Sequence, residues 1–79
     1  MTKYVSLGEW FLRQSADSVA VSFTDLDELV GGLPLSARSF PAWWANDRVH
    51  RQAYSWLNAG FHVEAVDIRA GLVVFARRA

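Results

Sequence analysis

The sequence contains no cysteine, which excludes disulfide bonds and thiolate metal sites and favours a reducing, cytoplasmic setting. It has no apolar run near the roughly 20 residues needed to span a membrane, and no signal-peptide pattern at its start. Two histidines alone make a poor metal site. We therefore expect a cytoplasmic protein with no membrane contact, no metal and no cofactor.

The chain also lacks a net charge, because eight basic residues balance eight acidic ones. This balance argues against a protein that holds polyanions through bulk electrostatics alone. The charges are unevenly spread: acidic residues gather in the first third, whereas residues 38–51 hold three arginines against Asp47 only. Seven of the eight basic residues are arginine, the side chain better suited to bidentate contacts and stacking.

Large apolar side chains are abundant instead. Hydrophobic residues make up 52% of the 79 residues, and they include four tryptophans and five phenylalanines. Each aromatic side chain can bury roughly 150 to 250 Å². A single domain over residues 1–79 can therefore form a core despite its small size.

The first third predicts a helix, a strand and a second helix. Ser6 begins a capping-box pattern ahead of a helix over residues 7–14. Strict alternation of apolar and polar residues predicts a half-buried strand over 18–23. Thr24 then has the position of an N-cap for a short helix over 25–30, and a glycine pair ends that helix.

The middle of the chain predicts a connector followed by a third helix. Residues 33–47 contain both prolines and no sustained period, so we expect an irregular segment with one helical turn near Ala37. Asn46 or Asp47 can cap a helix over residues 48–59. The apolar positions of this helix recur at helical spacing, which predicts its buried face.

The last third predicts two antiparallel strands. Alternation from Phe61 onwards, with a phase shift near Ala65 and Val66, indicates a bulged strand, and residues 69–71 offer a turn to its partner. The order of elements is helix, strand, helix, helix, strand, turn, strand. We expect an α+β fold: a small winged-helix-like domain of three helices with a small antiparallel sheet, in which helix 48–59 is the recognition helix.

Helix 48–59 carries the strongest functional signal. No acidic residue occurs within it, and Val49 and Trp56 are both expected on its buried face. Arginine, glutamine and serine on its other face are suited to base edges and phosphates. The predicted nucleic-acid contacts are Arg38, Trp43, Arg48, Arg51, Gln52, Ser55 and Arg69.

Trp43 and Trp44 stand side by side, and no regular backbone directs two neighbouring side chains to one face. We expect Trp44 to be buried and Trp43 to be exposed, whereas Trp10 and Trp56 fall on apolar helical faces and belong to the core. One interpretation is that the outer indole only covers the rim of a pocket. The other is that it stacks on an unpaired or flipped base, a contact worth roughly 1 to 3 kcal/mol.

These patterns favour a non-enzymatic DNA-binding domain, including a reader of modified, methylated-cytosine DNA. Catalysis is not indicated, because neither His50 nor His62 has a nucleophile pattern nearby. The alternative is a protein-interaction module, antitoxin-like or regulatory, in which the exposed indole of the Trp43–Trp44 patch anchors a partner.

The sequence resembles a small bacterial domain family of unassigned activity. The residues that carry the resemblance are Tyr4-Val5-Ser6-Leu7-Gly8-Glu9-Trp10, Phe23-Thr24-Asp25-Leu26, Leu33-Pro34-Leu35-Ser36-Ala37-Arg38, Trp43-Trp44-Ala45-Asn46-Asp47, Trp56-Leu57-Asn58-Ala59-Gly60-Phe61 and Val74-Phe75-Ala76-Arg77. Phe61 departs from the tryptophan that the family tends to carry. The resemblance implies an association with DNA, including modified DNA, and it transfers no catalytic residue.

Overall fold

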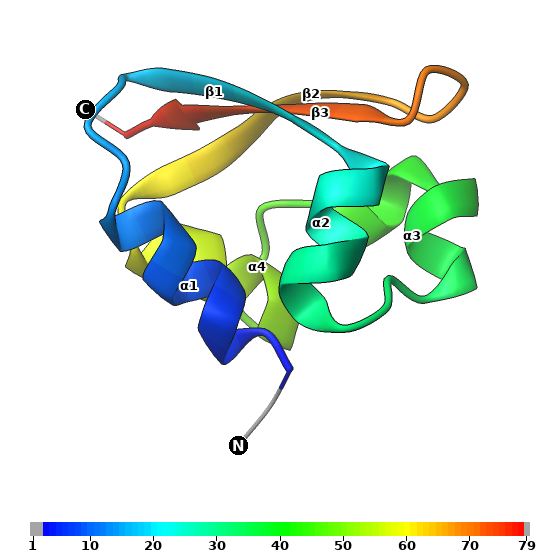
Figure 1. Cartoon of the computed structure of the whole chain (residues 1–79), viewed down its shortest axis with the longest axis horizontal. Helices are drawn as coiled ribbons and strands as arrows, with labels where there is room; N and C mark the ends of the chain where they lie inside the picture. The colour runs from blue at the N-terminus through cyan, green and yellow to red at the C-terminus, as the bar shows by residue number, and fades with distance from the viewer. Residues whose placement is uncertain (1–2, 79) are drawn as a thin grey trace.

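Alternation of apolar and polar residues produces a three-stranded antiparallel sheet in the computed structural model, which describes residues 3–78. The strands are β1 (Ser18–Ser22), β2 (Phe61–Asp67) and β3 (Leu72–Arg77), in the order β1-β3-β2. Figure 1 shows the sheet as one layer above the helices. Buried Val21 pairs with buried Val73, so the central strand carries the core face of the sheet. Residues 1, 2 and 79 of the predicted domain lie outside the described residues.

The β2–β3 hairpin has the predicted bulge and turn. The register shifts between Val63 and Ala65, one or two residues before the predicted position. Residues 68–71 form the turn, in which Gly71 has a φ of 67° and its carbonyl accepts a hydrogen bond from the Phe23 amide. This bond attaches the turn to the point where β1 ends. The pairing of Ser18 with Ala76 holds the other end of the hairpin against β1.

The number of helices differs from the prediction. The helices are α1 (Val5–Leu12), α2 (Phe23–Val30), α3 (Leu35–Ser39), the 3-10 helix η1 (Pro41–Trp44) and α4 (Arg51–Asn58). Residues 3–78 therefore contain four α-helices rather than three, and the fold is a small α+β arrangement. The additional helix lies where one helical turn near Ala37 was expected, because Pro34 begins it from an extended backbone. None of the described helices has the length and apolar character needed to cross a membrane.

The predicted caps of the first two helices are wrong. Ser6 lies inside α1, and its hydroxyl donates to the Leu29 carbonyl at 2.6 Å, so it ties α1 to α2 instead of starting a helix. The N-cap of α2 is Ser22, whose side chain accepts from the Asp25 amide, and Thr24 is within the helix. The chain enters α2 directly from β1 because Phe23 is buried in the core.

Three aromatic rings form a continuous stack in the core. Phe23 stacks on Trp44 with ring centroids 5.6 Å apart, and Trp44 stacks on Trp56 at 5.9 Å. Trp44 is buried, as predicted, and its indole N–H donates to the Ala37 carbonyl at 2.8 Å. Trp10 is half-buried against Phe11, so it belongs to the edge of the core rather than to its centre.

Trp43 is half-buried and not fully exposed. Its ring makes edge contacts with Trp44 at 4.6 Å and with Tyr4 at 6.1 Å. Successive residues of a 3-10 helix point about 120° apart, which sends the two indoles in different directions but leaves both close to the aromatic core. The predicted exposure of Trp43 is therefore wrong in degree.

The third predicted helix begins later than expected. α4 starts at Arg51 with His50 at its N-cap, and neither Asn46 nor Asp47 caps it. The Asp47 carboxylate instead accepts from the Val49 amide at 3.1 Å, which stabilises a turn before the helix. Val49 precedes the helix and has 81% of its surface exposed, so its predicted place in the core is wrong.

Asn46 joins the connector to both layers of the fold. Its Oδ1 atom accepts from the Trp56 indole at 3.0 Å and from the Val63 amide at 2.8 Å, and its Nδ2 atom donates to the Val63 carbonyl at 2.9 Å. β2 is an edge strand, so this side chain supplies the backbone partner that the sheet does not. It also satisfies the N–H group of a fully buried tryptophan.

Replacement of Asn46 tests this role. Asn46→Ala should lower the free energy of unfolding by about 2 to 3 kcal/mol, because it removes three hydrogen bonds and leaves the Trp56 N–H without its partner. Urea unfolding followed by tryptophan fluorescence measures the loss. Asn58→Ala removes the same side chain from an exposed position and should change the stability by less than about 0.5 kcal/mol. Equal effects of the two variants would contradict the role.

Candidate binding surface

A groove of about 550 Å³ runs between α1 and α4. The two helices pack closely where α1 carries Gly8, since a Cβ atom at this position would lie 3.4 Å from the Ser55 carbonyl. The residues that line the groove are Tyr4, Val5, Gly8, Glu9, Leu12, Arg48, Val49, Arg51, Tyr54, Ser55, Asn58 and Ala59. The absence of a side chain at Gly8 therefore allows α1 and α4 to approach each other closely at the floor of the groove.

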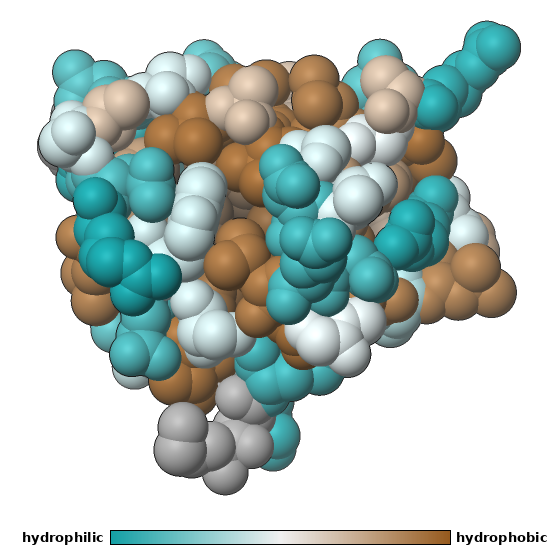
Figure 2. Space-filling view, viewed as in Figure 1, coloured by the Kyte–Doolittle hydropathy of each residue, from teal (hydrophilic) through white to brown (hydrophobic). Residues whose placement is uncertain are grey.

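Exposed apolar side chains are concentrated at this groove. Val5, Leu12, Val49 and Tyr54 all line it, and Leu12 has 72% of its surface exposed. Apolar surface is also exposed elsewhere: Figure 2 shows hydrophobic groups over α3, where Leu35 is exposed. A groove with several such side chains is the kind of surface at which soluble proteins bind other molecules.

Three of the predicted contact residues lie in this groove. Arg48 and Arg51 are exposed, and within residues 3–78 neither forms an ion pair. Ser55 is half-buried, and its hydroxyl donates to the Gln52 carbonyl at 2.6 Å. Glu9 of α1 is the acidic residue of the lining. The groove therefore combines two free guanidinium groups with apolar walls.

Gln52 and Trp43 lie at another side of α4. The Gln52 side-chain amide donates to the Trp43 carbonyl at 3.2 Å, so it holds the 3-10 helix against α4. Neither residue lines the groove. Gln52 therefore has a structural partner at the position where the sequence indicated a base contact.

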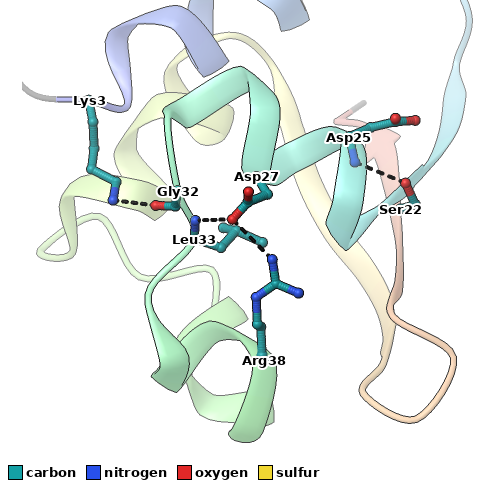
Figure 3. A network of polar contacts seen from close by, with 7 residues as sticks. All are labelled: Lys3, Ser22, Asp25, Asp27, Gly32, Leu33 and Arg38. Carbon is teal, nitrogen blue, oxygen red and sulfur yellow. Dashed lines mark hydrogen bonds and ion pairs between the residues drawn. The ribbon is translucent and has the colours of Figure 1, made fainter.

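Arg38 is also occupied within the fold. Its guanidinium donates to Asp27 Oδ1 at 3.0 Å, and the same oxygen accepts from the Leu33 amide at 2.7 Å (Figure 3). These two donors, the Leu33 amide first, lower the pKa of Asp27 below its ordinary value. The contacts link α2 to α3 and keep Arg38 out of the groove lining.

A second hollow lies where the connector passes the end of the sheet opposite the turn at residues 68–71. We call this end the open end of the sheet. The lining of the hollow consists of Asn46, Asp47, Arg48, Leu57, His62 and Arg78. Arg69 lies in the turn at the other end of the β2–β3 hairpin. With the rise per residue of an extended strand, this turn is about 20 Å from the hollow. The fold thus brings Arg48, Arg51 and Ser55 together but separates Arg38 and Arg69 from them.

Sequence reasoning missed several residues of these surfaces. Val49 was assigned to the core, and Arg78 was not among the predicted contacts. Tyr54 and Leu12 were recognisable only by elimination, because each falls outside the apolar stripe of its helix.

The model of a family described as a domain of unknown function (DUF7662) matches residues 4–79. The match spans nearly the whole chain, so the chain belongs to this family. Neither the curated proteins nor the solved structures yield a match. The family agrees with the resemblance to a small domain of unassigned activity. Its description assigns no function, so the function must be inferred from the chemistry of the groove and the hollow.

The Asp27 contacts predict how stability depends on pH. Folding lowers the pKa of Asp27, so its carboxylate stabilises the protein above the unfolded-state pKa, and this contribution disappears as the pH falls through the lower folded-state pKa. Asp27→Asn should therefore be less stable than the wild type at pH 7, and the gap should close below about pH 4. Urea midpoints across this range measure it.

Arg38→Ala provides the comparison for Asp27→Asn. It removes one of the two donors and leaves the Leu33 amide bond, so its destabilisation should be smaller with the same pH trend. A constant difference between wild type and Asp27→Asn at every pH would show that the carboxylate charge is not the source of the effect.

Proposed function

We propose that this member of the DUF7662 family binds duplex DNA through the exposed face of α4. The observation that carries the proposal is the row formed by Arg51, Tyr54 and Asn58, which are exposed, lie about one helical turn apart and face away from the buried Trp56. No acidic residue occurs from Arg48 to Ala59. A helix of this kind presents only donors and neutral groups to a polyanion.

The order of the elements supports the same proposal. A helix, a strand, two helices around a connector, and a hairpin, with the sheet order β1-β3-β2, are compatible with a winged helix, the arrangement that we propose. In that interpretation α4 is the recognition helix and residues 68–71 are the tip of the wing. The short α3 and the 3-10 helix then replace the tight turn between the two central helices of a helix-turn-helix.

Each exposed group of α4 has a chemical counterpart on DNA. The Arg51 guanidinium can donate two hydrogen bonds to a guanine, and the Asn58 amide can pair with an adenine. Tyr54 and the neighbouring Val49 offer apolar contact to sugars and thymine methyl groups. Arg48 suits a phosphate. In this proposal α4 contacts the bases, and Arg48, which precedes the helix, contacts the DNA backbone.

The modified-base form of the proposal is less well supported than plain duplex binding. Stacking on a flipped base needs an open indole face and a pocket to receive the base. The Trp43 ring already contacts Tyr4 and Trp44, and it does not line either hollow. Plain and cytosine-methylated duplexes should therefore bind with similar affinity.

Titration of labelled duplexes tests the proposal. Wild-type protein should bind at low salt and lose affinity as the salt rises, and Arg51→Ala should weaken binding by about 1 to 3 kcal/mol, because it removes a bidentate base contact. Arg13→Ala removes an equal charge from an exposed position outside both hollows and should have a smaller effect. Absence of wild-type binding to plain and methylated duplexes alike would refute the function.

A protein partner is the second candidate, and the apolar walls of the groove favour it. Val5 and Leu12 of α1 are exposed beside Tyr54, at a place where a DNA reader needs no apolar wall. An amphipathic helix with an apolar ridge could lie between α1 and α4, with its acidic residues near Arg48 and Arg51. This candidate uses the groove rather than the Trp43–Trp44 patch.

Leu12→Lys separates the two candidates. A lysine in the wall should abolish capture of a protein partner, since it places a charge in the apolar contact, but it should leave DNA affinity unchanged or slightly higher. Affinity capture from a cell extract and DNA titration measure the two effects. Leu35→Lys is the control, because Leu35 is equally exposed but lies on α3. Identical capture by wild type and Leu12→Lys would exclude the groove as the partner site.

A further inference from the structure

The second hollow is lined by basic residues that do not belong to the row on α4. Arg48 comes from the turn before α4, His62 from β2 and Arg78 from the residue after β3. Asp47 also lines the hollow, so two guanidiniums against one carboxylate leave one net positive charge when His62 is neutral. Within the described part of the chain, Arg48 and Arg78 form no ion pair.

The backbone holds both sides of this hollow in place. The Arg78 amide donates to the Gly60 carbonyl at 2.8 Å, and Asn46 is bonded to both backbone groups of Val63. The Asp47 carboxylate accepts from the Val49 amide, so part of its capacity is already used. Two guanidinium groups therefore extend from a fixed frame, which limits the entropy lost when they bind a ligand.

Arg77 and Arg78 are neighbours with opposite roles. The Arg77 guanidinium lies 4.6 Å from the centre of the Phe61 ring, donates to the Gln14 and Ala16 carbonyls, and pairs with Asp17 at 3.6 Å. Arg77 therefore has a structural role at the end of β3. Arg78 follows the last residue of the strand and lines the hollow instead.

We propose that the hollow lined by Arg48, His62 and Arg78 binds a phosphate of the DNA backbone next to the bases that α4 contacts. The inference rests on the proposed DNA binding and specifies the route of the duplex. Arg48 lines both the groove and the hollow, so a phosphate here lies beside the row on α4. Guanidinium groups and an imidazole N–H are suitable donors to phosphate oxygens. The backbone contact is then made at the open end of the sheet and not at the turn that holds Arg69.

The salt dependence of DNA binding tests this route. Each phosphate contact contributes about 0.9 to the magnitude of the slope of log K against log salt concentration, so Arg78→Ala and Arg48→Ala, which remove donors to the same phosphate, should each reduce that magnitude by up to about 1. Both should weaken binding to different duplex sequences by the same factor, because the phosphate carries no sequence information. Arg69→Ala should retain the wild-type slope. Titrations of a labelled duplex at several salt concentrations measure all four proteins.

Two further measurements make the result decisive. Arg78→Lys keeps the charge and should retain a slope near that of the wild type, whereas a slope as low as that of Arg78→Ala would overturn the charge-based role. Thermal unfolding should place Arg78→Ala close to the wild type, because among the described residues the Arg78 side chain makes no hydrogen bond or ion pair that holds the fold.

The outcomes separate the inference from the proposed function. If the wild type binds DNA and Arg69→Ala lowers the slope while Arg78→Ala does not, the backbone runs past the turn, so the phosphate site is wrong and DNA binding stands. If the wild type binds no DNA, the proposed function fails and the phosphate site fails with it. Loss of slope in Arg48→Ala and Arg78→Ala alone supports the site.

Discussion

The hydrogen bonds of Asn46 fix the position of α4 relative to the sheet. One side chain closes the free edge of β2 at Val63 and satisfies the indole of Trp56, which lies at the centre of the aromatic core. The connector that carries these bonds also carries Trp44, whose own indole bond reaches α3. The direction in which α4 presents its exposed face therefore depends on a polar contact, while the stacked aromatic rings add apolar burial beneath it.

Five of the seven arginines fall into two groups. Arg38 and Arg77 are bound by carboxylates and backbone carbonyls, and they hold elements together. Arg48, Arg51 and Arg78 line open surfaces instead. Because an exposed ion pair contributes little stability, the paired arginines matter mainly for geometry, and the unpaired ones are the groups available to a ligand. Net charge alone conceals this division, which is why a neutral chain can still present a locally basic surface.

The sequence predicted the strands well because alternation is a direct consequence of the pleat, and Val19 and Val21 follow it within β1, although the predicted strand extended one residue too far, to Phe23. It predicted helix starts poorly. Ser6 and Thr24 have the residue type of a cap, but the burial of Phe23 and the tie from Ser6 to Leu29 move both boundaries. Tertiary contacts decided each case, and they involve residues more than one turn apart. The same limit applies to the binding surface, because Leu12 and Arg48 meet in one groove only after α1 packs on α4.

Arg48 belongs to both the groove and the hollow, so a ligand that spans both must contact the apolar side chains of Val49 and Tyr54 and several guanidiniums together. A small anion would engage the hollow and leave Val49 and Tyr54 in water. An apolar peptide would cover the groove and leave Arg78 without a partner. Duplex DNA meets both requirements, because sugars and thymine methyl groups lie within a few ångströms of a regular row of phosphates. An acidic amphipathic helix meets them only when its charges extend beyond the groove toward the end of the sheet. The spacing of charge along the ligand therefore discriminates between the candidates more strongly than its total charge.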